Sequence, residues 1–112
     1  RRWFADQAAE LFRRHDVLLA PATPMSAPRV GTATVTLDGV EMPLRPNIGV
    51  YTQPISFIGL PVVAAPIWPP GARLPLAVQV IAPAWREDLA LRVARVLERE
   101  GIARAPVAPF GA

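Results

Sequence analysis

Proline is the sequence feature that most limits how this chain can fold. The 112 residues include 14 prolines, and proline fixes φ and lacks the N–H that the interior of a helix or strand needs. Most of the prolines lie between short apolar runs, as Pro21 and Pro61 do. We therefore expect an α/β arrangement of short strands and helices joined by ordered loops.

Amphipathic helices are predicted near both ends of the chain. Over residues 2–14, apolar side chains such as Trp3 recur at three- and four-residue spacing. A similar stripe begins at Leu89 within residues 85–99, and Gly101 follows as the residue that ends this second helix. An isolated helix of this length is marginally stable in water. Each of the two therefore needs an apolar surface to pack against.

Short apolar or alternating runs between these helices predict strands. The predicted strands cover residues 17–20, 34–37, 40–42, 62–65 and 76–82. Asp38 and Gly39 suit a two-residue hairpin turn, and the reversal at Pro69, Pro70 and Gly71 predicts that the last two strands are antiparallel neighbours. Residues 52–59 are typical of a short helix that begins at a threonine and ends at a glycine.

Composition narrows the class of protein. The net charge is +3, and the chain has arginine but no lysine. Carboxylates along the last helix offset its positive charge, so nucleic-acid binding is not indicated. There is no cysteine for a disulfide or thiolate, which fits a cytoplasmic protein. We expect neither a membrane span nor a signal peptide. The start at Arg1 indicates truncation or processing upstream.

Residues able to catalyse a reaction are scarce. The chain holds no lysine, and Ser26, Ser56 and His15 are its only serines and its only histidine. These do not make a nucleophile and base pair by spacing. One histidine without cysteine gives no metal-ligand pattern, and the glycines do not form a phosphate loop. We predict no catalytic residue, no metal and no cofactor within this chain.

Several motifs in order resemble the amidase signature family of hydrolases. Residues 51–61 read YTQPISFIGLP, which is similar to the late motif of those enzymes, and Ala65 and Pro66 follow. Upstream, residues 16–24 read DVLLAPATP, which resembles the family's proline-bounded strand end. Downstream, residues 74–79 read LPLAVQ before the charged terminal helix. The resemblance covers roughly residues 2–100 of the chain.

The resemblance implies a large single-domain α/β enzyme with a mixed sheet. Such enzymes hydrolyse amides through a lysine, a cis-peptide serine and a nucleophilic serine, all upstream of these motifs. Residues 1–112 would then form the C-terminal segment of one amidase domain, inactive alone, and would contribute core strands and part of the pocket wall. The implied partners are a small amide substrate, the upstream domain, and either a second copy or a small accessory subunit.

Four polar residues resemble the family's pocket border, which lies just before the Gly-Leu-Pro motif. These predicted substrate-binding residues are Tyr51, Thr52, Gln53 and Ser56. The alternative is structural, with Thr52 capping a helix and Ser56 bonding backbone. Gln79, an amide in an apolar strand, is expected to bond neighbouring backbone rather than substrate.

Several functional alternatives stay open. Glutamine-dependent amidotransferase subunits of the family have an aspartate where this chain has Gly49, which argues against ammonia supply for transfer RNA. The sequence of residues 52–61 more closely resembles that of the branch that hydrolyses carboxybiuret and related ureido compounds. Outside the family, the chain could be a small independent partner-binding module. An arginine-mediated nucleic-acid contact ranks last.

Overall fold

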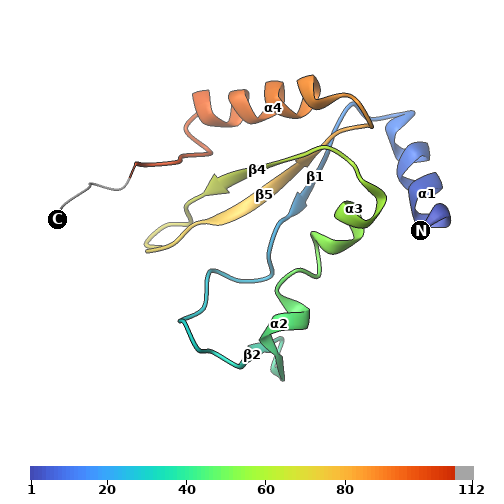
Figure 1. Ribbon diagram of the computed structural model, residues 1–112. Helices are drawn as coiled ribbons and strands as arrows, with labels where there is room; N and C mark the ends of the chain where they lie inside the picture. Colours follow the sequence, from blue (N-terminus) through green and yellow to red (C-terminus); the bar gives the residue numbers. More distant parts are fainter. Residues whose placement is uncertain (108–112) are drawn as a thin grey trace.

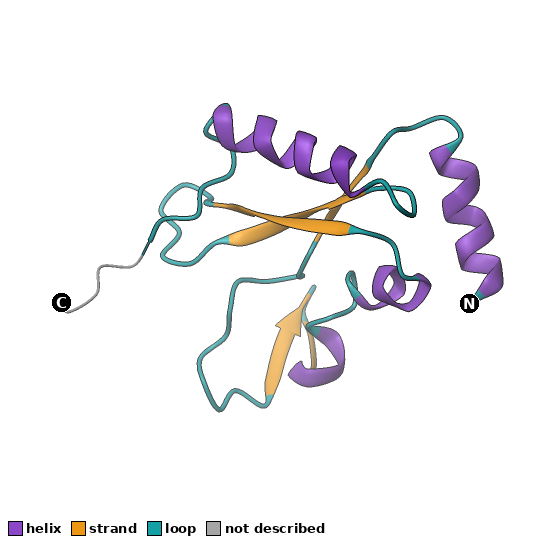
Figure 2. Cartoon of the chain, turned by 45° about the horizontal axis from the view of Figure 1, so that its top comes forward, coloured by secondary structure: helices purple, strands orange, loops and turns teal. Residues whose placement is uncertain are grey.

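A three-stranded sheet organises the computed structural model, which describes residues 1–107. In chain order the elements are α1 (Arg2–Phe12), β1 (Leu18–Pro21), β2 (Thr34–Leu37), β3 (Val40–Pro43), α2 (Leu44–Asn47), α3 (Gln53–Ile58), β4 (Val62–Ile67), β5 (Leu76–Ile81) and α4 (Glu87–Arg99). Helix α4 runs along one side of the sheet, while α2, α3 and the hairpin lie on the other (Figure 1). Figure 2 shows the same division from a second direction, with α1 beyond one end of the sheet.

The sheet has the strand order β1-β5-β4, and both of its strand pairs are antiparallel. This confirms the antiparallel pairing predicted from the proline-rich reversal between β4 and β5. The parallel pairs of a mixed sheet do not occur within residues 1–107. Strands β2 and β3 form a separate hairpin, which turns at Asp38 and Gly39 with φ of 50° and 79°, as predicted for this dipeptide.

The buried core lies between β5 and α4. Val80 and Ala82 are 0% exposed and Ala90 of α4 is 1% exposed, with Val63 and Leu89 packed around them. Val80 pairs in register with Val63, so both side chains lie on the face that α4 covers. Because side chains alternate along a strand, the neighbouring Gln79 lies on the opposite face, toward α3.

Substituting Ala90 tests how closely α4 approaches the sheet. Ala90→Leu adds three carbon atoms at a position with almost no free space, and such overpacking costs about 1–3 kcal/mol of unfolding free energy. Chemical denaturation of the protein measures the loss. Arg95→Leu, on the exposed side of the same helix, is the matched control and should change stability by less than about 0.5 kcal/mol. Equal effects of the two substitutions would contradict this packing.

Two local features differ from the sequence-based expectation. Helix α4 begins at Glu87 rather than Trp85, because Trp85 adopts a positive φ of 65°, outside the right-handed helical region. Leu44–Asn47 forms the unpredicted helix α2, in which Pro46 falls within the first turn, where its missing N–H costs no helical hydrogen bond.

Two prolines, Pro106 and Pro109, predict an extended tail over residues 103–112, and the first residues of this segment are extended. Ala103 forms an isolated antiparallel bridge with Ile67, and the Arg104 N–H donates to the Pro66 carbonyl at 3.0 Å. Trp68 Nε1 donates to the Arg104 carbonyl at 2.8 Å. Residues 108–112 of that predicted tail lie outside the described residues. Within residues 1–107, no helix combines the length and apolar character that crossing a membrane requires.

Candidate functional site

The four predicted substrate-binding residues lie together at the start of α3. Tyr51 is in the turn before the helix, Thr52 is the residue that precedes it, and Gln53 and Ser56 are within its six residues. Tyr51 is 43% exposed, Gln53 and Ser56 are also exposed, and Thr52 is half-buried. The structure therefore brings the set together on an accessible segment, on the side of the sheet opposite α4.

The Gly49 carbonyl shapes the turn that leads into α3. It accepts hydrogen bonds from the Thr52 N–H at 3.1 Å, the Gln53 N–H at 2.9 Å and the Thr52 hydroxyl at 3.2 Å. The prediction that Thr52 caps the helix is therefore wrong for its side chain, which makes no cap bond. Thr52 already has helical angles, φ −91° and ψ −34°, and in that conformation its hydroxyl reaches back to the preceding turn.

The structural alternative, in which the Ser56 hydroxyl bonds backbone, is not what residues 1–107 show. The Ser56 backbone N–H donates to the Thr52 carbonyl at 3.0 Å. Among the hydrogen bonds of residues 1–107, none involves the Ser56 side chain. The hydroxyl is thus exposed and free to meet another group.

The Gln53 side chain folds back over Gly49. A Cβ atom at Gly49 would lie 3.1 Å from Gln53 Nε2 and 3.3 Å from Gln53 Cγ, closer than most real side-chain contacts. The absence of a side chain at Gly49 therefore leaves the space that the Gln53 amide occupies. This amide carries two donors and one acceptor group, and it is exposed at the start of α3.

Gln79 connects this segment to the sheet. It is 2% exposed, and its Nε2 donates to the Pro21 carbonyl at 2.8 Å and to the Tyr51 carbonyl at 3.1 Å. The prediction that Gln79 bonds backbone is confirmed. Burial without these partners would be costly for an amide.

Gly59 ends α3 in the left-handed conformation, with φ 75° and ψ 34°. A Cβ atom there would meet nothing within 4 Å, so Gly59→Ala carries a conformational cost without a clash. We expect a loss of about 1 kcal/mol in unfolding free energy, measured by chemical denaturation. Gly59→Asn should lose less, because asparagine tolerates this conformation better. A larger loss for Asn than for Ala would refute the explanation.

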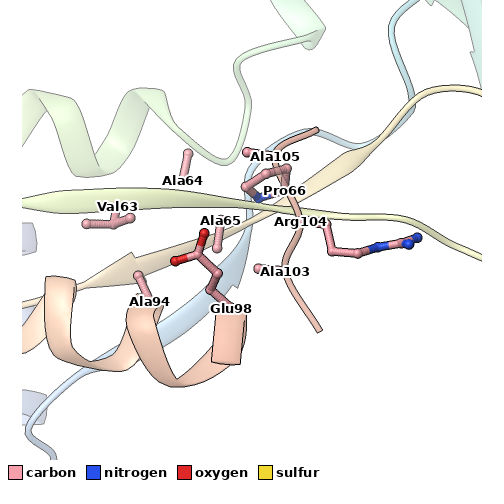
Figure 3. Close-up of a pocket in the computed structure, with 9 residues that line it drawn as sticks. All are labelled: Val63, Ala64, Ala65, Pro66, Ala94, Glu98, Ala103, Arg104 and Ala105. Atoms are coloured by element: carbon pink, nitrogen blue, oxygen red, sulfur yellow. The ribbon is translucent and has the colours of Figure 1, made fainter. Parts of the chain in front are cut away.

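Several hollows lie elsewhere on residues 1–107, and two of them border helices α4 and α1. Figure 3 shows one of about 150 Å³ between β4, α4 and the tail, where Arg104 extends away from Glu98 and the remaining lining is apolar. A second, of about 480 Å³, lies beside α1 and is lined mainly by apolar residues such as Phe12 and Leu60. The four predicted residues line neither. Neither hollow offers a set of polar groups suited to bond cleavage.

Ionisable groups do not assemble a reaction centre in the described part of the chain. Residues 1–107 contain no group of three or more His, Asp or Glu side chains that could hold a metal ion. Ser26 lies in the loop after β1 and Ser56 in α3, whereas His15 precedes β1, and no hydrogen bond described within residues 1–107 joins them. These residues therefore do not form a nucleophile and base pair.

A charged pair at the start of α4 shifts two pKa values. Arg86 donates from Nε to Asp88 Oδ1 at 2.8 Å and from Nη2 to Oδ2 at 3.0 Å. These bonds lower the pKa of the Asp88 carboxyl and raise the pKa of the Arg86 guanidinium. The Asp88 contribution to stability is present above its unfolded-state pKa and is lost as the pH falls through its folded-state pKa. Both side chains are about half exposed, so the pair is a solvated surface feature.

Comparison with known proteins establishes the class of this chain. The sequence profile of the family described as Amidase matches residues 1–91. The chain belongs to the amidase family, which confirms the resemblance carried by its proline-bounded motifs.

Individual relatives are much longer than this chain. The chain is 50% identical over 105 residues to a 1-carboxybiuret hydrolase subunit of Pseudomonas sp. (strain ADP), an alignment that covers 93% of this chain and 23% of that protein. It is 31% identical over 99 residues to a fatty acid amide hydrolase of Medicago truncatula, covering 88% of this chain and 16% of that protein. The chain thus spans less than a quarter of the length of these relatives.

Solved structures share the fold seen here. One, described as "An unexpected vestigial protein complex reveals the evolutionary origins of an s-triazine catabolic enzyme", aligns with a TM-score of 0.88 and 48% identity over 95% of this chain and 23% of its own. Another, described as "Crystal structure of amidase", aligns with a TM-score of 0.77 and 28% identity over 84% of this chain and 21% of its own. The helices and antiparallel sheet are therefore those of amidase-family proteins, as the predicted α/β class requires.

Proposed function

We propose that this chain is the C-terminal segment of an amidase domain that hydrolyses a carbon–nitrogen bond in a small amide or ureido compound. One observation carries the proposal: 93% of the chain aligns at 50% identity with a carboxybiuret hydrolase subunit, of which it covers 23%. The reactive lysine and serines would come from the remainder of the domain. In this proposal the complete protein is the enzyme.

The small buried core supports a segment of a larger domain over an independent module. Of the apolar residues buried within residues 1–107, only Val80 and Ile81 are large and fully enclosed, and all the others are alanines. Large apolar side chains are instead exposed, with Trp3 at 72%, Leu19 at 59% and Phe57 at 59%. Covering such side chains stabilises a fold by about 1.5–3 kcal/mol each. We propose that the rest of the domain packs over them.

The segment from Tyr51 to Ser56 is the proposed wall of the substrate pocket. The support is the position of the polar groups: the exposed Gln53 amide and Ser56 hydroxyl lie in α3, and the turn before this helix is held by hydrogen bonds to the Gly49 carbonyl and from Gln79. Held polar groups of this kind orient a small substrate within an otherwise apolar pocket. A pocket would be completed by groups from outside the chain, since neither hollow described above includes the segment.

A glutamine-dependent amidotransferase subunit is the second candidate. The chain is 35% identical over 95 residues to a glutamyl-tRNA(Gln) amidotransferase subunit of Akkermansia muciniphila, covering 82% of this chain and 19% of that protein. Gly49 and the higher identity to the carboxybiuret hydrolase subunit favour hydrolysis. We propose that the complete protein assembles either with a second copy of itself or with a small accessory subunit. Its location in the cytoplasm is a prediction from composition.

Ammonia release by the complete protein distinguishes these candidates. The hydrolase should release ammonia from carboxybiuret, or from a related small ureido compound or amide, without transfer RNA. The amidotransferase subunit should instead act on glutamine and depend on its partner subunits. Activity on glutamine alone would overturn the preferred assignment, and the molecular mass of the purified assembly would show whether a second copy or a small subunit is bound.

A further inference from the structure

Gln79 is the one polar residue in the buried class among residues 1–107. It lies in the central strand β5, directly opposite Ala20 of β1 and Ala64 of β4. Residues opposite one another in a sheet share a face. Two small neighbours therefore leave room on that face for the backbone before α3 to approach the sheet.

The two Gln79 bonds join three parts of the chain. The Pro21 carbonyl is at the end of β1, whereas the Tyr51 carbonyl is 28 residues from Gln79 in the turn before α3. A side-chain amide nitrogen carries two N–H donors, and each of these carbonyls accepts from it. Because a peptide unit is planar, holding the Tyr51 carbonyl also orients the Thr52 N–H, which donates to Gly49.

We propose that Gln79 is a positioning residue for the substrate pocket. Its amide holds the peptide between Tyr51 and Thr52 against the sheet, and so sets where Tyr51 and Gln53 meet the substrate. At 2% exposure it acts through this segment and touches no substrate. The part concerning substrate rests on the proposed function, whereas the part concerning backbone position stands on the hydrogen bonds alone.

The test uses two substitutions in the complete protein. Gln79→Glu keeps the shape but places a carboxylate without donors against two carbonyl oxygens, and Gln79→Met keeps the approximate length without charge. Each should speed hydrogen exchange of the backbone amides in residues 49–56 by about tenfold or more. The KM for the amide substrate should rise by about tenfold as well, with a smaller change in kcat.

Val80→Ala is the matched control. Val80 is the next residue of the same strand, is 0% exposed and faces α4, so its truncation weakens the core without touching Tyr51. It should leave the KM unchanged and should not selectively speed exchange in residues 49–56. If Val80→Ala and Gln79→Met changed the KM and the exchange of residues 49–56 alike, the effect of Gln79 would be one of general core packing, and the proposal would be overturned.

Each remaining outcome also decides something. Unchanged exchange in Gln79→Met would overturn the positioning role, and faster exchange with an unchanged KM would overturn its link to substrate. If the unsubstituted protein hydrolyses no amide, the proposed function fails, while the exchange data still judge the backbone role. If neither variant folds, nuclear magnetic resonance of the unsubstituted protein decides: slow exchange of the Gln79 side-chain protons supports the bonds, and exchange at the free rate refutes them.

Discussion

Assayed on its own, the 112-residue chain should leave small amides and ureido compounds unhydrolysed, whereas the complete protein should turn one of them over. The chain has no lysine, and its serines and histidine form no hydrogen-bonded pair in the described part. Because enzymes accelerate reactions by about a millionfold or more, loss of the reactive groups should take the rate to background. Ammonia release at equal molar concentrations measures the difference.

A control variant separates weak intrinsic activity from contamination. Ser56→Ala removes the one serine hydroxyl within the predicted pocket segment, and the rate with the isolated chain should stay at background in either form. Turnover that follows the purified 112-residue chain and disappears in Ser56→Ala would contradict the assignment of chemistry to the rest of the domain. The isolated chain should also bind a dye for exposed apolar surface, since Trp3 and Phe57 are uncovered.

The secondary structure was largely predictable because local residues decide it. Proline and glycine mark the ends of its short elements, and the Asp38 and Gly39 turn has the positive φ values that this dipeptide favours. Strand β5 follows the proline-bounded run seen in the sequence. The sequence predicts that α4 starts at Trp85, two residues before its observed start at Glu87, because the residues around Trp85 do not indicate its positive φ of 65°.

The sequence singles out the predicted pocket segment, but it does not reveal how that segment is connected to the sheet. Resemblance to a family motif singles out the segment that begins at Tyr51, and the structure places it in the turn before α3 and in the first residues of that helix. The bond from Gln79 to the Tyr51 carbonyl spans 28 residues, and a buried amide in a strand indicates only that some partner exists. The Thr52 hydroxyl also donates a hydrogen bond to the Gly49 carbonyl, and composition and spacing do not reveal this bond.

Gln53→Ala should be the most damaging single change in the pocket segment of the complete protein. The Gln53 amide is exposed beside Gly49, and its backbone N–H is already bonded to the Gly49 carbonyl at 2.9 Å. Removing the amide should leave α3 intact while a polar group of the substrate loses its partner, a loss of about 1–3 kcal/mol in binding. We expect the KM to rise by about 10- to 100-fold, measured by steady-state kinetics.

Two further variants locate the cause of that loss. Gly49→Ala leaves the Gln53 amide in place chemically but adds a Cβ atom 3.1 Å from Gln53 Nε2, so the side chain must move and the KM should rise by a smaller factor. Gln7→Ala removes an exposed amide from α1 instead and should leave the KM unchanged. If Gln53→Ala binds substrate as the unsubstituted protein does, Gln53 is not a pocket residue. If Gly49→Ala is the more damaging of the two, the backbone of the turn, rather than the Gln53 amide, governs substrate binding.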